Sequence, residues 1–180
     1  MLIDGRNLLY FVWGITLLSL FLFIPKNKIH LALVAFLFKL AMTWPLGLFV
    51  VNMGWIQYPI RLFENANKAS FTFEYLVYPV LCVYLNVYFP VKKHLLLRMA
   101  YYTVICSVVT LVELFLLYNT NLIIYIHWDA YLTWITLFVT FYLNRQFCVW
   151  FFKSYNKTSG YDLGVCPQTI SPKHNRKKSP

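Results

Sequence analysis

The 180-residue sequence is poor in charged residues and in glycine: Asp, Glu, Lys and Arg together make up 12% of it, six residues are acidic and six are glycine. A soluble domain carries about twice that share of charge on its surface, so this class is excluded. The sequence has no phosphate-binding glycine loop and no G-x-S-x-G or H-E-x-x-H motif. No Ser or Cys has a His and a carboxylate in an evident supporting arrangement. We therefore expect a protein that is not an enzyme.

The sequence also lacks the spacing of a metal site. Its four cysteines form no C-x-x-C pair, and Cys82 and Cys106 fall in apolar runs where a thiol is an ordinary packing group. His127 and Asp129 are two residues apart but have no further His near them in sequence. We interpret them as polar anchors beside an interfacial Trp128, and we expect no metal and no cofactor.

Long apolar runs are what the chain has instead. Hydrophobic residues make up 60% of it, aromatic residues 20%, and the mean hydropathy is +0.59. About 20 helical residues cross the hydrocarbon core of a bilayer. Residues 1–152 are therefore predicted to form an all-α integral membrane bundle of about five transmembrane helices. The predicted spans cover residues 8–24, 29–51, 71–89, 95–118 and 128–147.

Two segments are predicted to lie outside the bilayer. Residues 52–70 mix Trp55, Tyr58 and Phe63 with polar residues, which favours an outer loop lying along the membrane interface. Residues 153–180 are rich in Lys, Ser, Asn and Pro, which is typical of disorder. We expect this segment to be a basic tail.

Positive charge crowds into every second connection between the runs. Three Lys and Arg residues lie on one side (Arg6, Arg61 and Lys68), and Lys39 lies within a span. The other side holds twelve: Lys26, Lys28, Lys92, Lys93, Arg98, Arg145, Lys153, Lys157, Lys173, Arg176, Lys177 and Lys178. The positive-inside rule then predicts an outer N-terminus and a cytoplasmic C-terminus.

The same distribution bears on partners. The net charge of +10 lies in short loops and the tail rather than on a folded basic face, so we expect no nucleic acid. The tail suits anionic lipid or a protein partner. Association with a second copy or with another chain stays open.

Three ionisable side chains fall within the predicted spans: Lys39 near mid-depth, and Glu74 and Glu113 toward the outer side. Such groups are costly in lipid and commonly mark functional sites. We take these three as a candidate intramembrane polar site. The alternatives are that the Lys39 ammonium snorkels toward the interface, and that Glu74 forms an interfacial pair with Arg61 or Lys68.

Smaller polar residues recur at helical spacing and form stripes with these three. Thr110 belongs to the stripe of Glu113, while Asp129 and Thr133 begin the stripe of the last span. We expect the stripes to face one another inside the bundle. Small and hydroxyl residues are also ordinary helix-packing devices in membranes, so packing and a ligand or ion site both remain open interpretations.

Two prolines interrupt the predicted spans. Pro45 and Pro79 each lack a backbone donor, which predicts a kink and a freed carbonyl at Ala41 and Tyr75.

Several short stretches together resemble a known family. They are Phe71–Tyr75 with Tyr78-Pro79 and Asn86–Tyr88, then Val112-Glu113, then Tyr125, Trp128 and Tyr131. Over residues 31–152 the chain looks like a member of a family of small, uncharacterised multi-span membrane proteins from Bacillus- and Clostridium-type bacteria. The resemblance implies a bacterial cytoplasmic membrane and about five helices, and it carries over no activity and no catalytic residue.

These observations predict a polytopic membrane protein that serves as a non-enzymatic accessory, scaffold or sensor component. The alternative is a small-solute or proton-coupled carrier that uses Lys39, Glu74 and Glu113.

Overall fold

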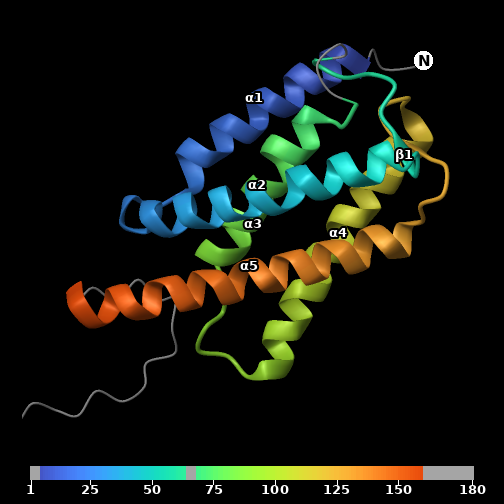
Figure 1. Cartoon of the computed structure of the whole chain (residues 1–180). Coiled ribbons are helices and arrows are strands. Elements are labelled where there is room, and N and C mark those ends of the chain that lie inside the picture. Colours follow the sequence, from blue (N-terminus) through green and yellow to red (C-terminus); the bar gives the residue numbers. More distant parts are fainter. Residues whose placement is uncertain (1–4, 64–67, 160–180) are drawn as a thin grey trace, which may run out of the picture.

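Helices make up most of the protein (Figure 1). The computed structural model describes residues 5–63 and 68–159, with side chains up to residue 153. The helices are α1 (Gly5–Phe23), a 3-10 turn η1 (Lys26–Lys28), α2 (Ile29–Asn52), a π-helical segment η2 (Thr72–Val77), α3 (Tyr78–Val87), α4 (Leu95–Asn119) and α5 (Ala130–Ser159). Two short strands are β1 (Ile56–Gln57) and β2 (Ile124–Tyr125).

The predicted all-α membrane bundle is confirmed. Four helical stretches are long and apolar enough to cross a membrane by length and composition: Gly5–Phe23, Lys26–Asn52, Leu95–Asn119 and Ala130–Lys153. The fifth predicted span is the shorter apolar helix Thr72–Val87. At helical rise it reaches about 24 Å, short of a hydrocarbon core of about 30 Å.

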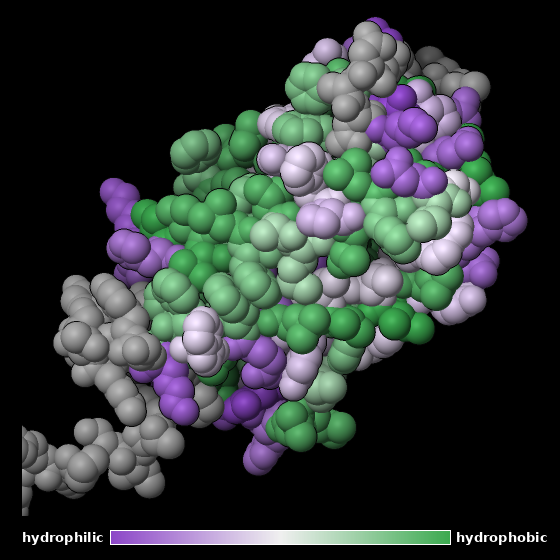
Figure 2. All heavy atoms as spheres, viewed as in Figure 1, coloured by the Kyte–Doolittle hydropathy of each residue, from purple (hydrophilic) through white to green (hydrophobic). Residues whose placement is uncertain are grey.

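Helix α2 lies at the centre of the packing, with α3 and α5 against it and α4 against α5 (Figure 1). Helix α1 buries only Gly5 and Leu9 among its residues. Figure 2 shows hydrophobic residues across the middle of one face and hydrophilic residues toward its ends. That distribution suits a helical bundle surrounded by lipid.

At helical spacing Lys39 shares a stripe with Ala32, Ala35 and Thr43, and all four are buried, as expected of a stripe that faces the interior. The stripe of Glu113 and Thr110 in α4 also includes Thr103, which is exposed, so this stripe faces the interior only in part. Helical spacing alone does not determine how far a neighbouring helix covers a face.

The second proline changes the type of helix. Pro79 stands at the start of α3 and follows the π-helical turn η2, whose last bond runs from the amide of Tyr78 to the carbonyl of Phe73. In a π-helix the acceptor lies five residues back, so Pro79 leaves the Glu74 carbonyl without the amide donor that would continue this turn. Helix α2 continues through Pro45.

The strands β1 and β2 pair antiparallel, with Ile56 opposite Tyr125 and Gln57 opposite Ile124. Beside this ribbon Tyr58 is 4% exposed, while Trp55 and Phe63 are exposed. The segment predicted to lie along the interface therefore packs partly into the end of the bundle.

Helix α5 continues beyond its predicted span to Ser159. Its last turns, from residue 153 onward, belong to the segment expected to be disordered. An established helix extends at little cost because each added residue gains one backbone bond. The rest of the predicted tail, residues 160–180, lies outside the described residues.

Candidate functional site: a polar cavity between α2 and α5

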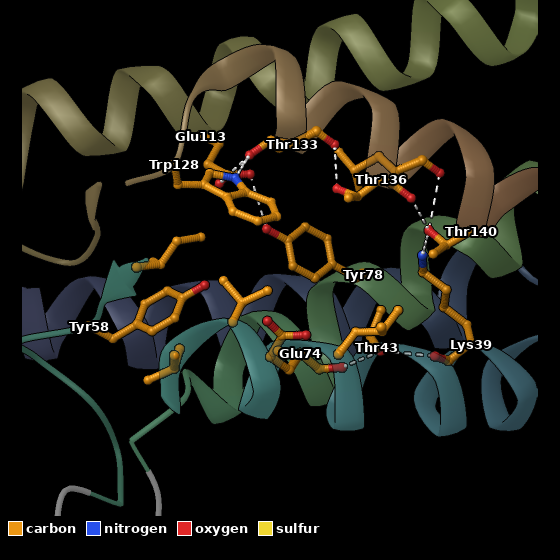
Figure 3. Close-up of a pocket in the computed structure, with 16 residues that line it drawn as sticks. Lys39, Thr43, Tyr58, Glu74, Tyr78, Glu113, Trp128, Thr133, Thr136 and Thr140 are labelled. Atoms are coloured by element: carbon orange, nitrogen blue, oxygen red, sulfur yellow. Dashed lines mark hydrogen bonds between the residues drawn. The ribbon is translucent and has the colours of Figure 1, made fainter. Parts of the chain in front are cut away.

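Lys39, Glu74 and Glu113 line one cavity of about 140 Å³ (Figure 3). They come from α2, η2 and α4, which are far apart in sequence. A cavity of this size exceeds the room needed for one water molecule. The polar and aromatic lining residues are Lys39, Thr43, Tyr58, Glu74, Tyr78, Glu113, Trp128, Thr133, Thr136 and Thr140.

Glu113 is held by hydroxyl groups. Tyr125 donates to Oε1 at 2.5 Å, Tyr78 donates to Oε2 at 3.1 Å, and the Thr133 hydroxyl lies 3.3 Å from Oε1. Trp128 in turn donates from Nε1 to the Thr133 hydroxyl at 2.8 Å. Bonds to a carboxylate are among the stronger hydrogen bonds, so this set fixes the orientation of Glu113.

Glu74 differs from Glu113 in having no such partners among residues 5–63 and 68–153. Its side chain is 7% exposed and lines the cavity, and no residue in the described ranges donates a hydrogen bond to its carboxylate. The carboxyl group lies against Gly47, where an added Cβ would come within 2.5 Å of it. Within the same ranges no ion pair joins Glu74 to Arg61 or Lys68, so the structure does not bear out an interfacial pair.

Lys39 is fully buried rather than snorkelling to the interface. Its Nζ donates to the Thr140 hydroxyl at 2.5 Å and lies 4.4 Å from the centre of the Phe141 ring. Among residues 5–63 and 68–153 no carboxylate forms an ion pair with this ammonium. A hydroxyl and an aromatic face are therefore its described partners.

Of the three stripe residues Thr110, Asp129 and Thr133, one lines the cavity and two do not. Thr133 lines it and contacts Glu113. Thr110 is buried outside the lining, and its hydroxyl has no hydrogen-bond partner among the described residues. Asp129 is exposed, and its carbonyl accepts the first backbone bonds of α5 from Leu132 and Thr133.

Two tyrosines from outside the helices were missed by the sequence analysis as site residues. Tyr58 lines the cavity, and Tyr125 donates to Glu113 from β2. Burial, and then the nearby carboxylates, raise the pKa of both phenols above the usual value, so both remain protonated donors at neutral pH. Tyr58 lies in the segment 52–70, which we interpreted as an interfacial loop, and Tyr125 lies three residues before Trp128, which we interpreted as an interfacial residue.

A second polar layer lies on the other side of Lys39 from Glu113. Asn86 donates to Asn144 Oδ1 at 3.0 Å, and Asn144 donates to the Ala35 carbonyl at 2.8 Å. Arg145 is 4% exposed and lies 4.3 Å from the centre of the Phe89 ring. These contacts bind α2, α3 and α5 together and close that end of the polar interior.

The cavity lining includes side chains that are exposed on the molecular surface. Leu46 of α2 and Thr136 of α5 are its exposed lining residues, and the two helices face each other across the cavity in Figure 3. Both residues lie within helices long and apolar enough to span a membrane. The exposed part of the lining therefore lies on the side of the bundle, part of the way along it.

No protein-family model matches the chain, and comparisons with curated proteins and with solved structures gave no match. The family resemblance noted in the sequence therefore stays a prediction. In the described part of the chain no three His, Cys, Asp or Glu side chains are grouped so that they would hold a metal ion.

Proposed function

We propose that this protein is a non-enzymatic, multi-pass membrane protein that binds a small solute in the cavity, as a sensor or a carrier. The observation that carries the proposal is the Glu74 carboxylate, which is buried at the cavity wall without a hydrogen-bond donor among the described residues. Burying an unpaired carboxylate costs on the order of several kcal/mol. A bound ligand that donates to Glu74 offsets that cost.

A purely structural role accounts less well for this arrangement. Helix packing in membranes is served by small residues and by polar groups that satisfy one another. Asn86 and Asn144 fit that description, and so does Glu113. Glu74 and Lys39 form no direct ion pair with each other, although both are buried in the same cavity. A scaffold gains nothing from two such charges.

The expected setting is the bacterial cytoplasmic membrane, with the N-terminus outside. In that orientation the cavity lies in the outer half of the bundle and the basic tail meets anionic lipid or a protein partner in the cytoplasm. Reporter fusions at each terminus test the orientation. Equal cytoplasmic signal from both ends contradicts it.

Solute binding is tested on the purified full chain in lipid nanodiscs. Isothermal titration calorimetry with a panel of small amines, carboxylates, amino acids and polyols is compared between the wild type and Glu74→Gln. We expect at least one solute to bind the wild type and to lose about tenfold or more in affinity in the variant. Asp129→Asn is the matched control, because this carboxylate is exposed outside the cavity. No binding by any probe, or equal binding by wild type and Glu74→Gln, contradicts the proposal.

Carrier and sensor are separated by uptake into proteoliposomes. A carrier accumulates the bound solute, and Asn144→Leu, which removes the polar layer beyond Lys39, changes its rate. A sensor binds the solute without moving it, so uptake matches that of empty liposomes.

A further inference from the structure

We propose that the ligand of this cavity is a small organic cation with a single positive charge, an ammonium group, which binds at Glu74 and enters laterally between α2 and α5. This inference rests on the proposed function and specifies its ligand.

The charged groups of the cavity lining favour a ligand with one positive charge. The cavity is lined by two carboxylates, Glu74 and Glu113, and by one ammonium, that of Lys39. In the fully ionised form, which a bound cation would favour, the lining carries one net negative charge. A ligand with one positive charge neutralises it, whereas an anion adds to it and a dication reverses it. Charge inside an apolar bundle is costly, so neutrality of the filled site decides among ligand classes.

Of the two cavity carboxylates, Glu74 is the one available to a ligand. Glu113 already accepts hydrogen bonds from Tyr125 and Tyr78. The Lys39 ammonium is engaged by Thr140 and Phe141 and forms no ion pair with Glu74. Glu74 therefore remains as the acceptor for an incoming donor. Its position against Gly47 leaves the carboxylate no room to withdraw toward α2.

The aromatic side chains of the cavity lining suit an organic ammonium group. Tyr58, Tyr78 and Trp128 line the cavity together with apolar side chains from α2. Aromatic faces attract organic ammonium groups, which are weakly hydrated and spread their charge over carbon. Inorganic cations instead require a shell of several oxygen ligands. The aromatic lining favours an alkylammonium group over a metal ion.

Two exposed lining residues, Leu46 and Thr136, favour entry from the side of the bundle. Each residue lies about 9 Å along its helix from the nearer end. An ammonium group at that depth arrives from one of two sources: a free amine that partitions into the interface, or the headgroup of an aminophospholipid. The recognised chemistry is the same in both.

The test uses the full chain in nanodiscs of phosphatidylglycerol, which has no amine. Calorimetric titrations with methylammonium and tetramethylammonium are compared with tert-butanol, a neutral molecule of similar shape, and with acetate. We expect both cations to bind, with Glu74→Gln weakening them about tenfold or more. Lys39→Met removes a positive charge from the cavity and is expected to tighten cation binding by about tenfold. Size-exclusion chromatography checks that both variants remain folded.

A second set of nanodiscs contains phosphatidylethanolamine. A fall in the apparent affinity for methylammonium identifies the lipid headgroup as the competing ligand, and an unchanged affinity identifies a free amine. Binding of tert-butanol or acetate as tightly as the cations overturns the inference while leaving solute binding intact. Weaker cation binding in Lys39→Met overturns it as well. Absence of cation binding overturns the inference, and only the absence of binding by every solute of the wider panel as well contradicts the proposed function itself.

Discussion

The Thr43 hydroxyl of α2 lies 3.1 Å from the backbone carbonyl oxygen of Glu74, the acceptor that Pro79 leaves without an amide donor. The same hydroxyl lies 2.9 Å from the carbonyl of Lys39, one turn earlier in its own helix. Thr43 thus connects the backbone of Lys39 with that of Glu74. The bond compensates for the proline and places Glu74 opposite α2.

We expect Thr43→Val to lower the stability of the protein by about 1–2 kcal/mol, because the buried Glu74 carbonyl loses its donor. The matched control is Thr136→Val. Its hydroxyl bonds only the carbonyls of Leu132 and Thr133 in its own helix, and its side chain is exposed. Thermal unfolding in nanodiscs measures both. An equal effect of the two changes would show that the hydrogen bond from Thr43 to the Glu74 carbonyl contributes nothing to stability.

Tyr125→Phe is expected to destabilise the bundle by about 1.5–3 kcal/mol, the range for a hydrogen bond to a charged group. The change removes the 2.5 Å bond to Glu113 and leaves the ring in place. Tyr131→Phe serves as control, since Tyr131 is 61% exposed. Chemical unfolding followed by circular dichroism gives the difference. A loss of stability in Tyr131→Phe as large as in Tyr125→Phe would show that the hydrogen bond from Tyr125 to Glu113 is not its cause.

Gly47→Ala is expected to reduce ligand affinity by about tenfold while the charge of the cavity is unchanged. The new methyl group would lie 2.5 Å from the Glu74 carboxyl carbon, so the carboxyl group has to move. Gly14→Ala is the control in α1, because nothing lies within 4 Å of its added Cβ. Alanine favours helix by about 1 kcal/mol over glycine at both positions. Calorimetry separates affinity from stability, and unchanged affinity in Gly47→Ala speaks against Glu74 as the binding group.

Stability is expected to fall as the pH rises above about 10. Burial raises the pKa of Tyr58 and Tyr125 above their usual value, so the unfolded chain loses these protons before the folded protein does. Unfolding then releases protons, and alkaline pH favours it. Melting temperatures between pH 8 and 11 measure the slope. In Tyr58→Phe the slope should be shallower, and an identical slope would show that this phenol ionises freely in the folded state.

The sequence predicted the charged members of the site because the evidence for them is local. Lys39, Glu74 and Glu113 each stand in an apolar run, and the cost of a charge in such a run does not depend on its neighbours in space. The helical class of the fold and the lengths of four of the five predicted spans follow from the same runs. Boundaries were less accurate, as α5 shows by continuing to Ser159.

The partners of those charges could not be predicted in this way. Tyr125 reaches Glu113 because β1 pairs with β2, and the sequence of two such short strands does not predict that pairing. The π-helical turn before Pro79 leaves the carbonyl of Glu74 without an amide donor, which was not expected from the sequence. Lys39 was expected to form part of a polar site or to snorkel, and only packing against Thr140 and Phe141 distinguishes the two.

The amino-acid sequence by itself therefore determined that this is a helical membrane bundle with three ionisable groups inside it, because apolar length and the cost of buried charge are properties of single segments. The tertiary structure decided that the three groups share one cavity, that Glu113 is fully bonded, and that Glu74 is not. Those facts depend on distances between residues far apart in the chain, which are set only when α2, η2, α4 and α5 pack together.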